Sequence, residues 1–348
     1  MRTMTIGHRK IGDGAPCFII AEAGSNHNCD LATALRLIDV AVEAGADCVK
    51  FQTYTAETLY SRFAPRLTEM EGRSRAEETP FELIKRIELP WEWHERLVAH
   101  ANAGGIIFLS TPFGHDAVDL LHRLGVPAFK IASYEIVDLP LLRRAARTGK
   151  PIILSTGNSS LADVEEAMAT LQEAGATGVV LLHCVSQYPA KVEDVNLRAM
   201  VTLRQAFDVP VGFSDHTMDS VSSLGAVALG ACVLEKHFTL DRSHPGPDHP
   251  VSLEPEELRR FVQDVRRLEA ALGSPVKRVQ VSEDENHRLG RRSLHARTRI
   301  PKGATITEEM LTVKRPGLGI KPVLLPVVVG RVARRDIEAD EWITWDMI

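Results

Sequence analysis

The sequence predicts an α/β protein whose first 272 residues form a closed barrel of eight parallel strands, the (β/α)8 or TIM barrel. Eight apolar runs of strand length alternate with amphipathic stretches of helix length, and the runs are apolar throughout, as expected of strands buried on both faces. The runs comprise residues 17–22, 47–52, 106–110, 128–131, 151–155, 178–184, 211–214 and 232–237. An open, doubly wound sheet is the alternative, but no GxGxxG motif follows the first run, which weakens a dinucleotide-binding interpretation.

Helix-like patterns follow these runs. The clearest cover residues 31–43, 139–147, 161–173 and 255–272. Crossover helices between parallel strands bring the carboxyl ends of all strands to the same end of a barrel, where active groups sit. One connection differs, because residues 53–86 are longer and more charged than the others. We interpret this segment as a candidate active-site loop.

The carboxy-terminal part of the chain predicts a second, small domain. Residues 273–290 are polar and are expected to form a linker, which leaves residues 291–348 as a β-rich module. Within the module, Ala296-Arg297-x-x-Ile300 and Ile306-Thr307-x-x-Met310-Leu311 recur with the same spacing as Ala333-Arg334-x-x-Ile337 and Ile343-Thr344-x-x-Met347-Ile348. This repeat suggests a pseudo-twofold with a Lys302-Gly303 turn in one half and an Ala339-Asp340 turn in the other. So small a module buries little core, and we expect it to dock on another surface.

Composition and charge narrow the class of protein. The chain has 348 residues, of which 44% are hydrophobic and 25% charged, as in an ordinary globular protein. The net charge of −5, with both signs interspersed, predicts no binding of nucleic acid or of an anionic membrane. A polar amino terminus and the lack of a long apolar run favour a cytoplasmic protein. The five cysteines are odd in number and lack CxxC spacing, which predicts reduced thiols rather than a disulfide or zinc site.

Two histidines that follow neighbouring apolar runs are the strongest functional signal. His216 lies just after residues 211–214, and His237 ends the run 232–237. The segment between them has room for one crossover helix, so both imidazoles are expected at the same crevice, where they could hold a divalent metal. Two protein ligands suit an exchangeable Mn2+, Mg2+ or Co2+, acting as a Lewis acid, better than structural zinc. The alternatives are that each histidine is an ordinary polar residue at a strand end, or that His183 is a competing ligand.

Polar residues at the other strand ends predict an anion site beside the metal. Lys50 and Gln52 fall on one face of the second strand, and Lys130 ends the fourth. Burying the ammonium group of a lysine costs free energy unless a negative charge lies next to it. The lysines, the hydroxyls and a Ser-Thr-Gly turn therefore predict a site that binds phosphate or carboxylate. The alternative is that the lysines form structural salt bridges to Glu22 or Glu135.

Several motifs together resemble the bacterial sialic acid synthases, over nearly the whole chain and in the same order. They are Ala-Glu22-Ala-Gly-Ser-Asn26-His27, Val-Lys50-Phe-Gln52-Thr, Ser110-Thr-Pro-Phe113, Leu-Leu-His183-Cys184, Tyr188-Pro, Phe-Ser214-Asp-His216-Thr, Leu-Glu-Lys-His237-Phe-Thr, Pro-Gly246-Pro-Asp248-His249 and Val-Lys-Arg315-Pro-Gly317. The resemblance implies a barrel followed by a small antifreeze-like (SAF) domain, packed as a domain-swapped homodimer. It also implies a transferase that condenses phosphoenolpyruvate with open-chain N-acetylmannosamine. The products would be N-acetylneuraminate and phosphate, formed by metal activation of the aldehyde and by C–O cleavage.

The same resemblance implies roles for individual residues. His216 and His237 would hold the metal, with Mn2+ expected ahead of Mg2+ or Co2+. The phosphoenolpyruvate would be surrounded by Lys50, Lys130, Thr111, Ser133, Ser155 and Ser214. The sugar or the reacting centre would be contacted by Glu22, Gln52, Tyr188 and Asp248. Glu135 would lie near the attacking water, and Arg315 would reach into the site of the partner subunit.

Two departures from the family pattern leave the acceptor sugar open. Where sialic acid synthases often read Lys-Ile-Gly-Ser-Gly-Glu, this chain has Ala132 and Tyr134, and the family's loop asparagine has no clear counterpart within residues 71–81. Both changes resemble the pseudaminic acid synthases, so the same reaction on a diacetamido-trideoxyhexose, giving pseudaminic or legionaminic acid, is the alternative. A Schiff-base aldolase using Lys50 or Lys130 and a carbohydrate-binding or ice-binding protein are further alternatives.

Overall fold

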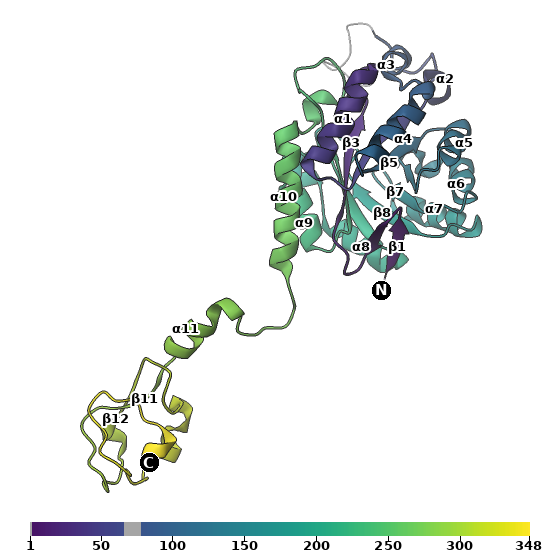
Figure 1. Cartoon of the computed structure of the whole chain (residues 1–348). Coiled ribbons are helices and arrows are strands. Elements are labelled where there is room, and N and C mark those ends of the chain that lie inside the picture. Colours follow the sequence, from purple (N-terminus) through teal and green to yellow (C-terminus); the bar gives the residue numbers. More distant parts are fainter. Residues whose placement is uncertain (1, 66–77) are drawn as a thin grey trace. The chain divides into compact units, whose positions relative to one another are not determined.

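The chain folds into two compact units, each with its own hydrophobic core. A computed structural model describes residues 2–65 and 78–348 and divides the chain into Met1–Gly273 and Ser274–Ile348 (Figure 1). The middle of the predicted active-site loop, residues 53–86, lies outside the described residues.

The first unit contains the predicted barrel of eight parallel strands. These are β3 (Phe18–Gly24), β4 (Cys48–Thr53), β5 (Ile107–Pro112), β6 (Phe129–Ile131), β7 (Ile152–Ser155), β8 (Val179–Cys184), β9 (Val211–Asp215) and β10 (Val233–His237). The hydrogen-bonded order is β5-β4-β3-β10-β9-β8-β7-β6, so strands adjacent in the sequence are neighbours, and β10 pairs with β3. At the remaining junction, β5 and β6 contact each other. This cyclic order excludes the open doubly wound sheet, and all eight predicted strands are confirmed with small shifts at their ends.

Helices surround the barrel (Figure 1). They are α1 (Leu31–Ala44), α2 (Ala56–Leu59), α3 (Pro80–Ile87), α4 (His94–Ala103), α5 (His115–Arg123), α6 (Leu139–Ala146), α7 (Leu161–Glu173), α8 (Arg198–Phe207), α9 (Val221–Ala228) and α10 (Pro255–Leu272). Short 3-10 helices are η2 (Trp91–Trp93), η3 (Ser133–Val137), η4 (Val192–Asp194) and η5 (His249–Val251). Local signals fix helix ends: the Asp30 carboxylate accepts a hydrogen bond from the Thr33 N–H and caps α1, and Gly45, with a φ of 78°, ends it.

The inward-facing side chains of the barrel change from apolar to polar along the strands. On β3, Phe18 and Ile20 belong to the inner core, and Glu22 follows at the next inward position. On β10, Val233 belongs to the same core, and Glu235 follows. The active site is therefore expected at the carboxyl end of the barrel.

A hairpin that the sequence analysis did not predict precedes the barrel. It pairs β1 (Thr3–Ile6) with β2 (Arg9–Gly12). Ile6 and Ile11 are fully buried and join the inner core formed by the first residues of the strands. The hairpin thus fills the amino-terminal end of the barrel.

The second unit has the predicted pseudo-twofold. Its elements are η6 (Val281–Glu283), α11 (Asp284–Leu289), β11 (Ser293–Ala296), η7 (Glu308–Met310), β12 (Leu311–Lys314), η8 (Pro322–Leu324), α12 (Leu325–Val328) and η9 (Trp345–Met347). Ile300 and Ile337 exchange two backbone hydrogen bonds of 2.9 Å, as a residue and its repeat should across a local twofold. The two predicted turns are also equivalent, since Gly303 and Asp340 have φ values of 85° and 77°. Residues 273–290, predicted to be a linker, include η6 and α11, and from residue 274 they are grouped with this unit.

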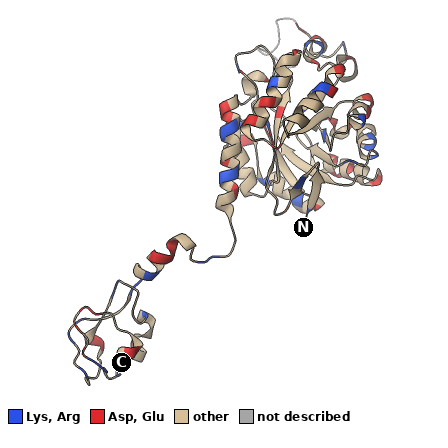
Figure 2. Cartoon of the chain, viewed as in Figure 1, with Lys and Arg blue, Asp and Glu red and all other residues tan. Residues whose placement is uncertain are grey.

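The surface of the first unit carries both charge signs. Figure 2 shows Lys and Arg interspersed with Asp and Glu over the outer helices. All five cysteines are free thiols, of which only Cys29 is exposed. Within the described ranges, none of the helices combines the length and apolar character that crossing a membrane requires.

Candidate active site

Side chains from all eight barrel strands meet in one small cavity at the carboxyl ends of the strands. Its volume is about 60 Å³. Eleven of the fourteen predicted site residues line it: Glu22, Lys50, Gln52, Thr111, Lys130, Ser133, Ser155, Tyr188, Ser214, His216 and His237. The other lining residues are Phe113, Ala132, Tyr134, Cys184, Ser186 and Glu235.

Two lysines and two carboxylates form the buried centre of this cavity. Lys50 Nζ lies 2.8 Å from Glu22 Oε2 and 3.6 Å from Glu235 Oε2. Lys130 Nζ lies 3.5 Å from Glu235 Oε1, which also accepts a 3.0 Å hydrogen bond from the Ser214 hydroxyl. Each of the four charged side chains is at most 5% exposed. The salt bridge between Lys50 and Glu22 that the sequence offered as an alternative is therefore present, and Glu235 joins both lysines.

The environment sets distinct charge states for these groups. Burial raises the pKa of Glu22 to about 7, against the opposing charge of Lys50. Burial also favours the protonated form of Glu235, but the charges of Lys130 and Lys50 outweigh it and lower the pKa to about 2. Burial acts to lower the pKa of Lys50, but the carboxylates raise it overall, whereas burial lowers the pKa of Lys130. At neutral pH, Glu235 is ionised and Lys50 is protonated, while Glu22 can exchange a proton.

Hydroxyl and amide groups around the lysines suit an oxyanion. Thr111 Oγ1 accepts a 3.0 Å hydrogen bond from Lys50 Nζ. Ser133 Oγ accepts one of 3.0 Å from the Gly157 N–H, in the predicted Ser-Thr-Gly turn. Ser155 Oγ is buried without a hydrogen-bond partner. Leaving a buried polar group unpaired costs about 1–3 kcal/mol, which an oxygen of a bound anion would offset.

The rings of the two histidines lie edge to face, with centroids 5.6 Å apart. His216 Nδ1 donates a 2.8 Å hydrogen bond to the Val185 carbonyl, so Nε2 is unprotonated when the ring is neutral. Burial acts to lower the pKa of His216, but the Cys184 sulfur, 3.8 Å from Nδ1, raises it overall. Tyr188 stacks on the His216 ring at a centroid distance of 4.0 Å. His237 Nδ1 is buried without a hydrogen-bond partner, 3.9 Å from Asp248 Oδ2. Burial lowers the pKa of His237 to about 4, so its imidazole is neutral at pH 7, as a metal ligand must be.

This pair fits an exchangeable metal better than a closed metal site. Across residues 2–65 and 78–348, no three His, Cys, Asp or Glu side chains are grouped so as to hold a metal by themselves. A histidine whose Nδ1 donates to a carbonyl, as that of His216 does, has the usual form of a metal ligand once its ring is neutral. Water and substrate would supply the remaining positions around a divalent ion.

Gly24 permits the close approach of Asp248 to His237. Its φ is 51°, and a Cβ placed there would stand 2.7 Å from Asp248 Oδ2, which accepts a 3.0 Å hydrogen bond from the Ser25 hydroxyl. We expect Gly24→Ala to displace Asp248 and to lower the free energy of unfolding, measured by urea denaturation, by about 1–3 kcal/mol. Gly125→Ala is the matched control, because Gly125 has a φ of 75° and open space around it. Equal losses in the two variants would contradict this role of Gly24.

Three predicted site residues lie outside the cavity lining. Asp248 does not line the cavity itself but lies next to His237, which does. Glu135 lies in η3, where its Oε2 is buried without a hydrogen-bond partner and burial raises its pKa to about 7. Arg315 is exposed in the second unit.

The proposal of His183 as a competing metal ligand is wrong. Its Nε2 lies 2.7 Å from the Val195 carbonyl oxygen, and its ring stacks on Phe213. It does not line the cavity. His183 lies near the end of an apolar run, as His237 does, but on β8 the inward position belongs to Cys184.

Sequence reasoning missed Glu235, Cys184 and Ser186 as site residues. Glu235 stands two residues before His237 on the same strand, so the two-residue period of a strand places both on the inward face. That signal was available in the sequence. Cys184 was interpreted as a core cysteine, and Ser186 lies in a loop, where no periodicity indicates its direction.

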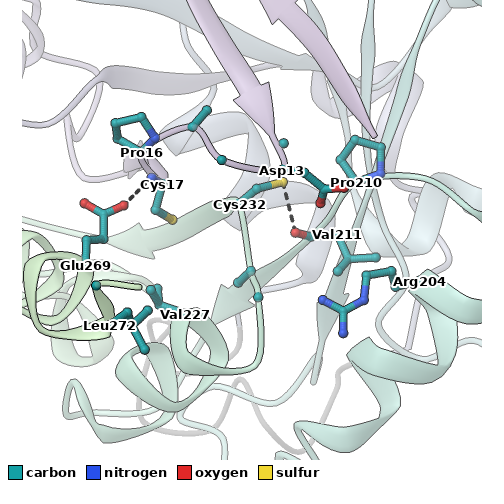
Figure 3. Close-up of a pocket in the computed structure, with 16 residues that line it drawn as sticks. Asp13, Pro16, Cys17, Arg204, Pro210, Val211, Val227, Cys232, Glu269 and Leu272 are labelled. Carbon is teal, nitrogen blue, oxygen red and sulfur yellow. Dashed lines mark hydrogen bonds between the residues drawn. The ribbon is translucent and has the colours of Figure 1, made fainter. Parts of the chain in front are cut away.

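A larger cavity in the first unit lies at the opposite ends of the strands. Its volume is about 530 Å³, and it lies near the amino ends of β3, β9 and β10 (Figure 3). There the Cys232 thiol donates a 3.1 Å hydrogen bond to the Val211 carbonyl, and the Cys17 N–H donates to the Glu269 carboxylate. These groups already have partners, and the amino-terminal face of such barrels contributes to stability rather than catalysis. The smaller cavity is therefore the candidate active site.

A (β/α)8 barrel with two lysines, two histidines, carboxylates and hydroxyls at the carboxyl ends of its strands is the arrangement of an enzyme that acts on an anionic substrate. The NeuB family profile matches residues 37–277, and the SAF domain profile matches residues 291–348. The chain therefore belongs to the NeuB family, as its motifs predicted.

Named relatives cover nearly the whole chain. It is 44% identical to the N,N'-diacetyllegionaminic acid synthase of Campylobacter jejuni, over 93% of this chain and 98% of the relative. It is 37% identical to the human N-acetylneuraminate-9-phosphate synthase, over 98% of this chain and 95% of the relative. The crystal structure of the N-acetylneuraminic acid (sialic acid) synthetase of Leptospira borgpetersenii, 38% identical, covers 82% of this chain and 95% of its own, with a TM-score of 0.72. The protein is thus an enzyme of the acid-synthase type.

Proposed function

We propose that the protein condenses phosphoenolpyruvate with the open-chain aldehyde of an N-acetylated six-carbon aldose, forming a nonulosonic acid and phosphate. One observation carries this proposal: buried Lys50 and Lys130 share a cavity with His216 and His237. The lysines suit an anionic substrate, and the histidines suit a metal that activates a carbonyl.

The lysine half of the cavity would bind phosphoenolpyruvate. Without substrate, Lys50 and Lys130 have Glu235 between them as a shared counter-charge. The phosphate and carboxylate of the substrate would add charge-assisted hydrogen bonds to both ammonium groups. The hydroxyls of Ser155, which has no partner, and of Ser133 line the same cavity. They would orient the phosphate and carboxylate oxygens of the substrate.

The histidine half would bind the sugar aldehyde. A divalent ion held by His216 and His237, for which we propose Mn2+ with Mg2+ or Co2+ as alternatives, supplies a Lewis acid for the aldehyde oxygen. Tyr188 packs against both rings, with centroid distances of 4.0 and 5.8 Å, and limits their rotation. Asp248, whose Oδ2 lies 3.9 Å from His237 Nδ1, would contact the sugar beside this histidine.

The reaction needs proton transfers that two carboxyl groups can provide. Carbon three of the enol attacks the aldehyde carbon, positive charge develops at carbon two, and the new alkoxide takes a proton. Water then adds at carbon two and gives up a proton. The bond between carbon two and the bridging oxygen breaks, and this oxygen leaves with the phosphate. Burial raises the pKa of both Glu22 and Glu135 to about 7, which suits a general acid or base near neutral pH. The ionised Glu235 favours the positive charge at carbon two.

Substrate entry would require side chains at the rim to move. The cavity holds about 60 Å³, whereas sites for small molecules usually measure roughly 300–1,000 Å³. Tyr134 lines the cavity and is 54% exposed, so it lies at the rim.

The residues of the same site also bear on which acceptor sugar the enzyme uses. N-acetylmannosamine, giving N-acetylneuraminate, is our first candidate. A diacetamido-trideoxyhexose, giving legionaminic or pseudaminic acid, is the alternative. Ala132 and Tyr134 line the cavity where sialic acid synthases often have glycine, and they add carbon atoms where a substituent of the sugar would fit. The names of the relatives include a diacetyllegionaminic acid synthase, a pseudaminic acid synthase and an N-acetylneuraminate-9-phosphate synthase.

Phosphate release tests this proposal. The full-length enzyme is incubated with phosphoenolpyruvate, Mn2+ and each candidate sugar, and inorganic phosphate is measured. We expect release with at least one N-acetylated six-carbon aldose and none without sugar. A complete lack of release across the panel would refute the proposed reaction.

A Schiff-base aldolase is a second candidate because burial lowers the pKa of Lys130, which favours a neutral, nucleophilic amine. Lys50, whose pKa is raised, is a poor nucleophile by the same reasoning. Borohydride treatment in the presence of the sugar or of pyruvate, followed by mass spectrometry, distinguishes the two reactions. A reduced covalent adduct, with activity insensitive to EDTA, would favour the aldolase.

We also propose a domain-swapped homodimer in which Arg315 completes the site of the partner subunit. In such a dimer, mixing Arg315→Ala protein with His216→Ala protein restores one complete site in each mixed dimer. We expect each variant alone to be inactive and an equimolar mixture, after subunit exchange, to recover about a quarter of the wild-type rate. A mixture that stays inactive although mixed dimers form would refute the exchange of Arg315.

A further inference from the structure

A second charged cluster lies behind the two histidines, on the outer face of the barrel. Residues of a strand alternate between faces, so Asp215 and Lys236 lie on the face opposite to the cavity. The two are register partners on β9 and β10, and their side chains are 0% and 2% exposed. Neither lines the cavity, so the cluster contacts no substrate.

The Lys236 ammonium group binds the loop that follows β9. Its Nζ lies 3.0 Å from Asp215 Oδ2 and donates to the backbone carbonyls of Thr217 and Asp219. An ammonium group has three protons, and here all three have acceptors. Two of those acceptors are backbone atoms, so Lys236 constrains the path of the chain and not only a side chain.

Asp215 is bound from several sides as well. Its Oδ1 accepts hydrogen bonds of 2.8 Å from both the N–H and the hydroxyl of Thr217. Its Oδ2 accepts one of 2.6 Å from the hydroxyl of Ser223 in α9. The cluster thus ties the loop to β10 on one side and to α9 on the other.

His216 lies between the two residues that this cluster fixes. Asp215 precedes it and Thr217 follows it, so a shift of this backbone would move its Nδ1 away from the Val185 carbonyl, which lies 2.8 Å away. We propose that Lys236 and Asp215 are positioning residues, which hold His216 so that its free nitrogen meets the metal. The inference deepens the proposed function and relies on its metal.

Binding of Mn2+ to the full-length protein, followed by electron paramagnetic resonance of the free ion, tests the inference without turnover. We expect Lys236→Met to raise the Mn2+ dissociation constant by about tenfold or more, the range typical of residues that orient metal ligands. At saturating Mn2+, the KM for phosphoenolpyruvate should stay within about twofold of the wild-type value, because the lysine half of the cavity is untouched. Ser223→Ala, which removes one hydrogen bond, should fold and weaken Mn2+ binding several-fold.

A core variant separates positioning from stability. Leu121→Ala in α5 removes a fully buried side chain far from β9 and β10 in the strand order, so it should lower the melting temperature without changing Mn2+ affinity. Wild-type Mn2+ affinity in Lys236→Met or, if that variant does not fold, in Ser223→Ala would overturn the inference. If the wild-type protein binds no Mn2+, the proposed metal fails. The crystal structure of Ser223→Ala then decides the positioning role: loss of the His216–Val185 hydrogen bond supports it, and retention overturns it.

Discussion

Replacing His216 by alanine is expected to lower kcat/KM by roughly a thousandfold, equivalent to about 4 kcal/mol of transition-state stabilisation. The reason is that the proposed metal has only two protein ligands, so the loss of one leaves His237 to hold it alone. We also expect Mn2+ titration of the variant to show no saturation at concentrations that saturate the wild-type enzyme. Steady-state kinetics with phosphate release as the readout measures both effects.

His183→Ala is the matched control for this prediction. The residue lies near the end of barrel strand β8, but outside the cavity, with its Nε2 at the Val195 carbonyl. Its variant should keep Mn2+ dependence and the wild-type kcat within a few-fold. The reverse result, in which Mn2+ dependence is lost with His183→Ala and kept with His216→Ala, would refute the assignment of the metal ligands.

Glu235→Gln is expected to destabilise the barrel by about 3–5 kcal/mol. The substitution keeps the size of the side chain but removes the negative charge between Lys50 and Lys130. Removing one partner from a buried ion pair costs about 3–5 kcal/mol. Here Lys130 loses its carboxylate partner, whereas Lys50 keeps Glu22 at 2.8 Å. We expect a loss of this size in urea denaturation at pH 7. The KM for phosphoenolpyruvate should rise as well, because the loss of Glu235 favours the neutral form of Lys130.

The pH dependence of stability provides an independent check. The folded pKa of Glu235, about 2, lies below its ordinary value of 4.5. Its contribution to stability is therefore complete above pH 4.5 and is lost as the pH falls towards 2. The stability difference between wild type and Glu235→Gln should shrink over that range. Asp119→Asn, which breaks an exposed ion pair with Arg144, should leave stability nearly unchanged at either pH; a constant difference for Glu235→Gln would contradict its buried ionised state.

Much of the fold followed from periodicity in the sequence. Parallel strands buried on both faces are apolar throughout, so each of the eight runs was visible, and α7 and α10 matched the predicted residues at both ends. The repeat in the tail identified the local twofold because identical residues occupy identical places across it, as Ile300 and Ile337 do. The β1–β2 hairpin was missed because short, mixed-polarity strands carry little signal before their partner is known.

The candidate site was predictable where side-chain direction follows from strand period. Lys50 and Gln52 were placed on one face for that reason, and both line the cavity. The role of Glu235 as the shared counter-charge depends on distances across three strands, which no local pattern contains. His183 was a misleading candidate for a related reason: it sits at a strand end, but the register turns it outward. The positioning cluster of Asp215 and Lys236 likewise became visible only when their register pairing was known.

The most direct test of the proposed reaction follows the bridging oxygen of phosphoenolpyruvate. The substrate is labelled with 18O between carbon two and phosphorus and incubated with the full-length enzyme, Mn2+ and the accepted sugar, and the released phosphate is analysed by mass spectrometry. Condensation with C–O cleavage predicts that the phosphate retains the label, because water attacks carbon two. Unlabelled phosphate, with the 18O in the sugar acid, would show attack at phosphorus and contradict the mechanism proposed for this site.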